Sequence, residues 1–342
     1  MTLATTILDE YRLAYARSKM DAYEHRLSIY GGFQTFLNDT PNLIPGYADL
    51  QLGKTYQAQT VSIPVIQRAT YSTSATRACT KNTDENTSAY EDVTFTTIET
   101  GFQMLKAQYK SNNIQYQEDF NRKMIDVQRT FLAALDTAAL TNLNTNKSAV
   151  NNADGNPYTV ASNIMVVPEE DNDLFFNELG SIMLQNDFDG FYNVVATPRV
   201  RALIRELTAQ GSANDMNTQF QFDNYSLAYT RSVTPATGYR DVVYAMPTGS
   251  LGYLSWIDVD SQMGNRSSDG HEWSTQMLPL LGHNVGLLYS STCASKDSTL
   301  TGLDATLHES WQFSFDYAFI NAYNSDSSTY PGTIFRADFS KS

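Results

Sequence analysis

The feature that most constrains this chain is one long amphipathic pattern that neither proline nor glycine interrupts. It runs from Asn113 to Leu143, and its apolar residues recur at steps of three and four, as on one face of an α-helix. These residues are Tyr116, Phe120, Met124, Val127, Phe131, Ala134 and Ala138. Such a helix would be about 45 Å long, well above the globular average. The sequence therefore predicts one unusually long helix with Phe131 in the middle of its buried face.

Two strand-like runs with a polar segment between them precede this helix. Apolar residues alternate with other residues in both runs, namely Val61, Ile63 and Val65 in the first and Val93 and Phe95 in the second. We expect Pro64 to place the first run at a sheet edge and the second run to end before Gly101. Residues 70–87 are small and polar apart from Tyr71, so they cannot form a core of their own. Residues 56–100 therefore predict a long two-stranded projection, which generally needs another surface to lie on.

The N-terminal region predicts a helix followed by an extended arm. Residues 7–30 have an apolar face at helical spacing, and Gly31-Gly32 is expected to end that helix. The segment Thr40 to Lys54 contains prolines and glycines, which favour an extended arm.

Alternating helices and strands are predicted after the long helix. We expect helices at Leu174–Asn186 and from Thr197-Pro198 to Gly211, with a strand at Phe191–Ala196 between them. Further apolar runs predict strands at Tyr225–Arg231, Asp241–Ala245 and Leu251–Ile257, followed by an apolar stretch at Met277–Tyr289. Near the C-terminus a strand has a wholly aromatic face that must be buried, formed by Trp311, Phe313, Phe315, Tyr317 and Phe319.

Charge narrows the classes of function. With a net charge of −14, the chain is a poor candidate for gripping nucleic-acid phosphates over a broad basic face. Charged residues make up only 18%, and a surface of neutral polar groups is less repelled by a copy of itself, which favours self-association. Arg199, Arg201 and Arg205 lie on one predicted helix and are interpreted as a solvated face or an ion-pairing surface between subunits.

No pattern for catalysis or for binding a cofactor or a metal is found. The sequence has no G-x-S-x-G elbow, Walker loop, dinucleotide fingerprint or H-E-x-x-H motif. The histidines lack the spacing of metal ligands; they are His25, His271, His283 and His308. Cys79 and Cys293 are expected to be free thiols rather than one disulfide. Neither a signal sequence nor a membrane span is predicted. We therefore expect neither an enzyme nor a cofactor-dependent protein.

Taken in order, these parts resemble the HK97-like fold of the major capsid proteins of tailed bacteriophages. KTYQAQTVSIPVIQRATYSTSATRA resembles the outgoing arm of that family's E-loop, and NNIQYQEDFNRKMIDVQRTFLAALDTAALTNL resembles its spine helix. FNELGSIMLQNDFDGFYNVVATPRVRALIREL resembles the first part of its axial domain. The resemblance covers nearly the whole chain, and it rests on order and pattern because the family has no short signature. It implies an α+β fold with five regions: an N-terminal helix and arm (1–54), an E-loop (55–103), a peripheral domain with the spine helix (104–170), an axial domain (171–300) and a return strand to the peripheral domain (301–342).

The function that the resemblance implies is structural. The chain would self-assemble as hexamers and pentamers into the icosahedral head shell that encloses double-stranded DNA, without sequence-specific DNA binding. Its expected partners are other copies of itself, a separate scaffolding protein and a portal, with decoration proteins as a further option. The scaffolding protein is expected to be separate because the arm-like helix begins almost at Met1. The expected location is the virion, and the host cytoplasm before assembly.

The tip of the E-loop is the predicted contact with an adjacent subunit. Its charged residues Arg77, Lys81, Asp84 and Glu85 are expected to find partners on the neighbour's spine and arm. Some members of the family form a lysine–asparagine isopeptide bond from this loop. Lys81 is one lysine in a polar loop, so no cross-link is predicted here.

Two other functions stay open. An encapsulin-like nanocompartment shell shares the fold and would enclose cargo enzymes instead of DNA. A secreted carbohydrate-binding or hydrolytic protein is suggested by the 21 tyrosines, and the missing signal sequence argues against it.

Overall fold

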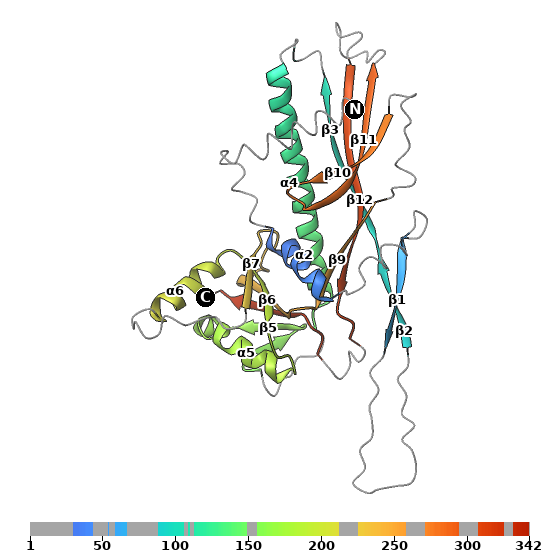
Figure 1. Ribbon diagram of the computed structural model, residues 1–342. Helices are drawn as coiled ribbons and strands as arrows, with labels where there is room; N and C mark the ends of the chain where they lie inside the picture. The colour runs from blue at the N-terminus through green and yellow to red at the C-terminus, as the bar shows by residue number, and fades with distance from the viewer. Residues whose placement is uncertain are drawn as a thin grey trace, which may run out of the picture.

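The fold is organised around one long helix, two sheets and a projecting ribbon. The computed structural model describes residues 30–43, 54, 59–66, 88–105, 109, 113–148, 156–211, 225–257, 271–293, 307–324 and 331–341. Helix α4 (Asn113–Thr145) runs beside the strands of the first sheet, and the second sheet lies near the lower end of this helix (Figure 1). The ribbon lies on the side of the first sheet that is away from α4 (Figure 1). The predicted α+β class and the predicted long helix are confirmed.

The ribbon consists of β1 (Thr60–Ile66) and β2 (Ser88–Thr94). They pair antiparallel, which places Val61 opposite Val93 and Ile63 opposite Glu91. The predicted two-stranded projection is therefore confirmed for these residues.

The sequence predicts that the return strand ends before Gly101, and this prediction is wrong. The chain continues as β3 (Thr96–Leu105) straight through this glycine. A Cβ at Gly101 would lie 2.4 Å from the carbonyl oxygen of Trp311, so the glycine permits the close approach of two paired strands. Its role here is packing rather than termination.

The first sheet has the strand order β10-β11-β12-β3, and β9 pairs with the other end of β12. Its further strands are β9 (Leu251–Trp256), β10 (His271–Leu278), β11 (His283–Cys293) and β12 (Leu307–Asn321). The stretch Met277–Tyr289, predicted as one apolar run, spans a hairpin whose turn contains Gly282 at φ 76°. The alternation of β12 is confirmed, but its aromatic face is only partly buried: Trp311, Phe313 and Phe315 are buried, whereas Tyr317 and Phe319 are half-buried.

Helix α4 packs its buried face against this sheet. The ring of Phe120 lies 5.0 Å from Trp311, and that of Phe131 lies 5.2 Å from Phe315. In the second half of the helix the prediction chose the wrong residues, because Ala134 is exposed and Ala138 half-buried. Instead, the residues that follow Phe131 at intervals of four are buried in the core, namely Leu135, Ala139 and Leu143.

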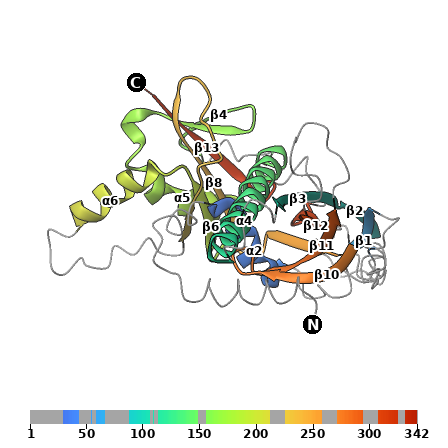
Figure 2. The same ribbon diagram turned by 90° about the horizontal axis from the view of Figure 1, so that it is seen from above.

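The second sheet has six strands in the order β4-β5-β13-β8-β6-β7. They are β4 (Thr159–Ala161), β5 (Ile164–Val167), β6 (Tyr192–Ala196), β7 (Tyr225–Tyr229), β8 (Tyr239–Pro247) and β13 (Phe335–Ser340). Helices α5 (Phe175–Gln185) and α6 (Val200–Gly211) cover the face that carries Val194 and Val243. The opposite face, with Val195 and Val242, joins the core around α4, which lies between the two sheets (Figure 2).

The sheets cross the predicted boundary between axial and peripheral regions. Strands β9, β10 and β11 fall within residues 171–300 yet belong to the first sheet, while β4, β5 and β13 lie outside that range and complete the second sheet. Periodicity identifies strands along the chain, but it does not say which distant strands pair. The helices and strands predicted between Leu174 and Ile257 are nevertheless present, with ends shifted by a few residues.

The N-terminal prediction is wrong at Gly31-Gly32. These glycines begin helix α2 (Gly31–Leu43), which includes part of the predicted arm and contains Pro41. A Cβ at Gly31 would lie 2.4 Å from the carbonyl oxygen of Tyr229, so this glycine lets α2 sit directly against β7. The helix predicted at residues 7–30 lies outside the described residues apart from Tyr30.

Two buried carboxylates attach α2 to the rest of the fold. Asp39 accepts hydrogen bonds from the backbone N–H groups of Gly249 at 2.7 Å and Leu251 at 2.9 Å. Asp136 of α4 accepts one from the N–H of Phe33 at 3.0 Å. Because charge-assisted bonds of this kind are stronger than neutral ones, α2 is firmly held between α4 and β9.

Candidate functional site: a projecting ribbon and the groove beside α4

The root of the ribbon is attached to the body by a buried lysine. The Nζ atom of Lys54 lies 3.2 Å from Oδ2 of Asp316 on β12 and 4.3 Å from the ring centroid of Trp256 on β9. The Asp316 carboxylate also accepts a hydrogen bond from the hydroxyl of Thr97 at 2.7 Å. A small apolar core of Val93, Phe95, Leu254 and Ala318 surrounds this point. The ribbon is thus fixed at its base.

The two faces of the ribbon differ. Val61, Ile63 and Val65 share a half-buried face. On the opposite face the base is polar, with paired hydrogen bonds such as Ser62 Oγ to Asp92 Oδ1 at 2.6 Å.

Farther along that opposite face three apolar side chains are exposed: Pro64, Ile66 and Tyr90. Ile66 is 73% and Tyr90 75% exposed. Pro64 pairs with Tyr90, and Ile66 follows two residues later on the same side of the strand. We call these three residues the ribbon patch. It lies on a sheet of only two strands, which has no described partner on either edge.

A groove of 810 Å³ runs between the second half of α4 and β12. We call it the Ala–Thr groove. Its lining is Ala133, Ala134, Thr137, Ala138, Thr141, Asn142, Thr145 and Asn146 of α4, with Thr94, Thr96, Tyr317, Ala318 and Phe319 on the other side. The hydroxyls of Thr137 and Thr141 donate to helix carbonyls at 2.8 Å, so they are already satisfied. The small side chains of α4 explain why Tyr317 and Phe319 are left half-buried.

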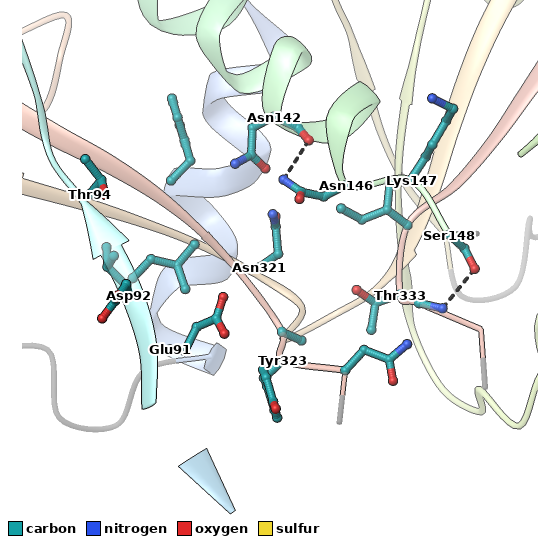
Figure 3. A pocket seen from close by; sticks show the side chains of 17 residues that line it. Glu91, Asp92, Thr94, Asn142, Asn146, Lys147, Ser148, Asn321, Tyr323 and Thr333 are labelled. Atoms are coloured by element: carbon teal, nitrogen blue, oxygen red, sulfur yellow. Dashed lines mark hydrogen bonds between the residues drawn. The ribbon is translucent and has the colours of Figure 1, made fainter. Parts of the chain in front are cut away.

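A second depression of 490 Å³ continues from this groove and shares Thr94, Asn142, Asn146 and Phe319 with it. We call it the acceptor pocket. It lies between β2, the C-terminal end of α4, the end of β12 and residues 332–334 (Figure 3). The amide oxygens of Asn142 and Asn321 are buried there without a hydrogen-bond partner.

The predicted contact residues Arg77, Lys81, Asp84 and Glu85 all lie outside the described residues, and so does Cys79. Their role as an inter-subunit contact stays a prediction. The surfaces just described were not found by sequence reasoning. Pro64 was noticed only as a sign of an edge strand, and nothing in the sequence distinguishes Asn142 or Asn321 from the many other asparagines.

Buried charged groups elsewhere in the body have partners inside the chain. Glu309, which is 1% exposed, accepts hydrogen bonds from the hydroxyls of Tyr116 and Tyr289, the latter at 3.3 Å. Asp338 forms a two-pronged ion pair with Arg336, at 2.7 Å and 2.8 Å. Because these groups are satisfied by structural bonds, they are poorly suited to chemistry on a substrate.

His271, His283 and His308 are the histidines that lie among the described residues. Nε2 of His283 lies 3.0 Å from the hydroxyl of Tyr253, and burial lowers the pKa of this histidine. Among the described residues no group of three or more His, Cys, Asp or Glu side chains could hold a metal ion. Within the same part of the chain, no helix is long and apolar enough to cross a membrane.

Comparisons with known proteins find similarity only among solved structures, since no family model and no curated protein matches. A structure from Microbacterium phage Oxtober96 is 17% identical, covers 86% of this chain and 90% of its own, and has a TM-score of 0.48. The capsid of Myoviridae phage XM1 is 12% identical, with 89% and 91% covered and a TM-score of 0.47. The capsid of Ralstonia phage GP4 is 9% identical, with 83% and 84% covered and a TM-score of 0.46. The function is therefore inferred from the protein's own surfaces.

Proposed function

We propose that this chain is the major capsid protein of a tailed bacteriophage, a structural subunit that assembles into the icosahedral shell around double-stranded DNA. The observation that carries the proposal is the ribbon patch. An isolated two-stranded ribbon is marginal in water, and this one leaves Ile66 73% and Tyr90 75% exposed. A monomer gains nothing from such a feature, whereas a subunit that lies against a neighbour buries it.

The same chain carries a surface that suits this ribbon. The Ala–Thr groove is shallow, and small side chains of α4 line one side of it, while Tyr317 and Phe319 line the other. A flat apolar face of the ribbon can therefore approach α4 closely. Contact between the ribbon patch of one copy and the groove of the next is heterologous, meaning that it joins two different surfaces. Repeated with a rotation that closes, such contacts form rings. Hexamers and pentamers are rings of this kind.

Charge is consistent with a container for DNA. A net charge of −14 disfavours tight binding of the chain to phosphates, so enclosed DNA is free to move. Scaffolding, portal and decoration proteins are further partners within this proposal, and the virion is the proposed location, preceded by the host cytoplasm. The tip residues Arg77, Lys81, Asp84 and Glu85 remain proposed contacts with the adjacent subunit.

Electron microscopy and sedimentation of the purified chain test the proposal. We expect shell-sized particles at high concentration or with a crowding agent. The double variant Ile66→Thr/Tyr90→Thr should have the same melting temperature as the unassembled wild-type subunit but should fail to assemble. A protein that stays monomeric under all these conditions contradicts the proposal. Particles isolated from the natural host separate the two kinds of shell, because a phage head protects DNA from nuclease and a nanocompartment holds cargo enzymes.

A further inference from the structure

The second sheet separates its charges along one edge. Strands β5, β13, β6 and β7 run in the same direction, because β5 pairs parallel with β13, β6 pairs parallel with β7, and β8 pairs antiparallel with both β13 and β6. The carboxyl ends of these four strands therefore lie at the same edge of the sheet. A negative group of side chains follows β5 there, and a positive group follows β6 and β7.

The negative group is the acidic segment, a name that we give to residues 169–173. It contains Glu169, Glu170, Asp171 and Asp173, of which all but Asp171 are exposed. Its fifth residue, Asn172, is 4% exposed, and its Oδ1 has no hydrogen-bond partner among the described residues. Native proteins rarely leave a buried acceptor without a donor. The segment therefore combines negative charge with a missing donor.

No cation close in the sequence balances this segment. Residues 148–198 contain no lysine, arginine or histidine. Negative charge near the N-terminus of α5, which begins at Phe175, is favourable. One or two carboxylates suffice for that role, whereas four within five residues also repel one another. The helix dipole therefore does not account for the whole segment.

The positive group is the basic surface, which consists of Arg199, Arg201, Arg205 and Arg231. All four side chains are exposed. Burial raises the pKa of Tyr229 on β7, and the charges of Arg201 and Arg205 oppose that rise, which places both arginines near β7. Figure 2 shows α6 at the outer side of the second sheet, so the basic surface lies at the β7 end of the edge.

The arginines are unfavourably placed within their own chain. Arg199 and Arg201 flank Val200, the first residue of α6, where the helix dipole disfavours positive charge. Residues 199–205 and 225–240 contain no acidic residue. In the part of the chain that the structure describes, none of the four arginines forms an ion pair. A negative group from outside the chain would compensate them.

The spacing of the strands keeps the two charged groups of one chain apart. Four strand-to-strand steps separate β5 from β7. Each step is about 4.8 Å, so the ends of these two strands are about 19 Å apart. An ion pair requires a separation of about 4 Å. Opposite charges at the two ends of one edge are instead arranged to meet between copies.

We propose that the basic surface of one copy binds the acidic segment of a second copy. This inference rests on the proposed function only in requiring that copies of the chain associate, and it involves neither the ribbon patch nor the Ala–Thr groove. Arginine suits the contact, because its five N–H donors can bond carboxylates in pairs and can also supply an amide oxygen such as that of Asn172. Since the contact joins two different surfaces, each copy keeps one of them free for the next copy.

Two charge-reversed variants of the full chain test the contact. Arg201→Glu/Arg205→Glu reverses the basic surface, and Glu169→Lys/Glu170→Lys reverses the acidic segment. Each variant alone should raise the concentration needed for half-assembly about tenfold or more, because like charges then face each other. An equimolar mixture of the two should restore that concentration to within about threefold of wild type, because each variant then complements the other. Melting of unassembled subunits checks that both variants fold.

A matched control distinguishes the contact from a general effect of net charge. Glu118→Lys/Asp189→Lys changes the charge as much as reversal of the acidic segment does, at exposed positions on α4 and before β6. This control should assemble like the wild type. Raising the salt concentration from about 0.1 M to about 1 M should weaken association of the mixture, because it shortens the Debye length from about 10 Å to about 3 Å.

Sedimentation velocity separates this inference from the proposed function, because it detects small complexes as well as shells. The mixture should form complexes that neither variant forms alone. Such complexes without shells from the wild type would support the contact and count against the proposed function. Variants that assemble like the wild type, or a mixture that associates no better than its components, overturn the inference.

Discussion

Lys54 and Asp316 form a nearly buried ion pair at the base of the ribbon, with 3.2 Å between Nζ and Oδ2. Only 1% of the lysine side chain and 16% of the aspartate side chain are exposed. The ammonium also faces the rings of Trp256 and Phe95, at 4.3 Å and 5.6 Å from their centroids. The pair therefore connects the segment before β1 to both β9 and β12. It defines the direction in which the ribbon leaves the body.

Removing the negative partner of this pair should destabilise the subunit. Asp316→Asn leaves a buried ammonium without its carboxylate, so we expect a loss of about 2–4 kcal/mol in the free energy of unfolding, moderated by the remaining aromatic contacts. Lys54→Met keeps the apolar stem against Trp256 and should cost less. Urea unfolding of unassembled subunits measures both. Equal losses for the two variants would mean that packing, not the ion pair, holds the ribbon root.

The core around α4 should depend strongly on Phe131. This side chain is fully buried and packs on Phe315 of the first sheet. Phe131→Ala should cost about 3–5 kcal/mol through lost burial and the cavity that remains. Thr137→Ala, on the exposed side of the same helix, is the control and should change stability by about 0.5 kcal/mol or less. Normal yield and melting temperature for Phe131→Ala would show that α4 is not the core of this region.

Local sequence patterns predicted the helices and strands of this fold better than they predicted which strands pair. Helix α4 and strand β12 follow directly from their periods, because a long amphipathic stripe and a strict alternation each fit only one kind of structure. The register between distant segments was not predictable. Gly101, for example, was interpreted as the end of a strand, whereas its actual role depends on Trp311, which lies more than two hundred positions later in the chain.

The candidate site was predictable in outline only. Alternation and the polar segment predicted the projection, but the exposed faces of Ile66 and Tyr90 depend on register and on what covers each side. The Lys54–Asp316 ion pair and the unpaired amide oxygens of Asn142 and Asn321 arise where several elements meet, so no local pattern indicates them. Charged tip residues were chosen because they stood out in a neutral segment, and their contacts stay a prediction.

The stability of the subunit should fall at high pH because burial raises the pKa of several tyrosines, among them Tyr289 and Tyr109. Burial, together with the carboxylate of Glu309, raises the pKa of Tyr289 to about 12. Burial, together with Asp119, raises the pKa of Tyr109 to about 12 as well. In the unfolded chain both hydroxyls ionise near the ordinary tyrosine value of about 10. The unfolded state therefore loses protons first, and the free energy of unfolding should decrease as pH rises from about 10 to 12.

Tyr289→Phe removes one of these hydroxyls and should make that decrease shallower. Urea unfolding between pH 8.5 and 11.5, values spanning the ordinary ionisation of tyrosine at about 10, measures the slope for the variant and the wild type. The comparison at the lowest pH isolates the loss of the hydrogen bond to Glu309, because both states of the protein keep their tyrosines neutral there. An unchanged slope would show that Tyr289 does not contribute to the pH dependence.

Replacing the ribbon tip should separate folding from assembly. Residues 70–87 contain no large apolar side chain except Tyr71, so they contribute little to the core of their own subunit. Because Ile66 pairs with Ser88, an Asn-Gly turn in place of residues 67–87 joins β1 and β2 in their antiparallel register. The variant should therefore be folded and soluble, with a far-ultraviolet circular dichroism spectrum and melting temperature close to those of the wild-type subunit. Shell assembly should stop or be misdirected, because the same contact is lost at every equivalent interface. Electron microscopy shows whether the variant forms shells. An unfolded variant would place the segment in the core, and normal shells would show that the tip makes no essential contact with a neighbour.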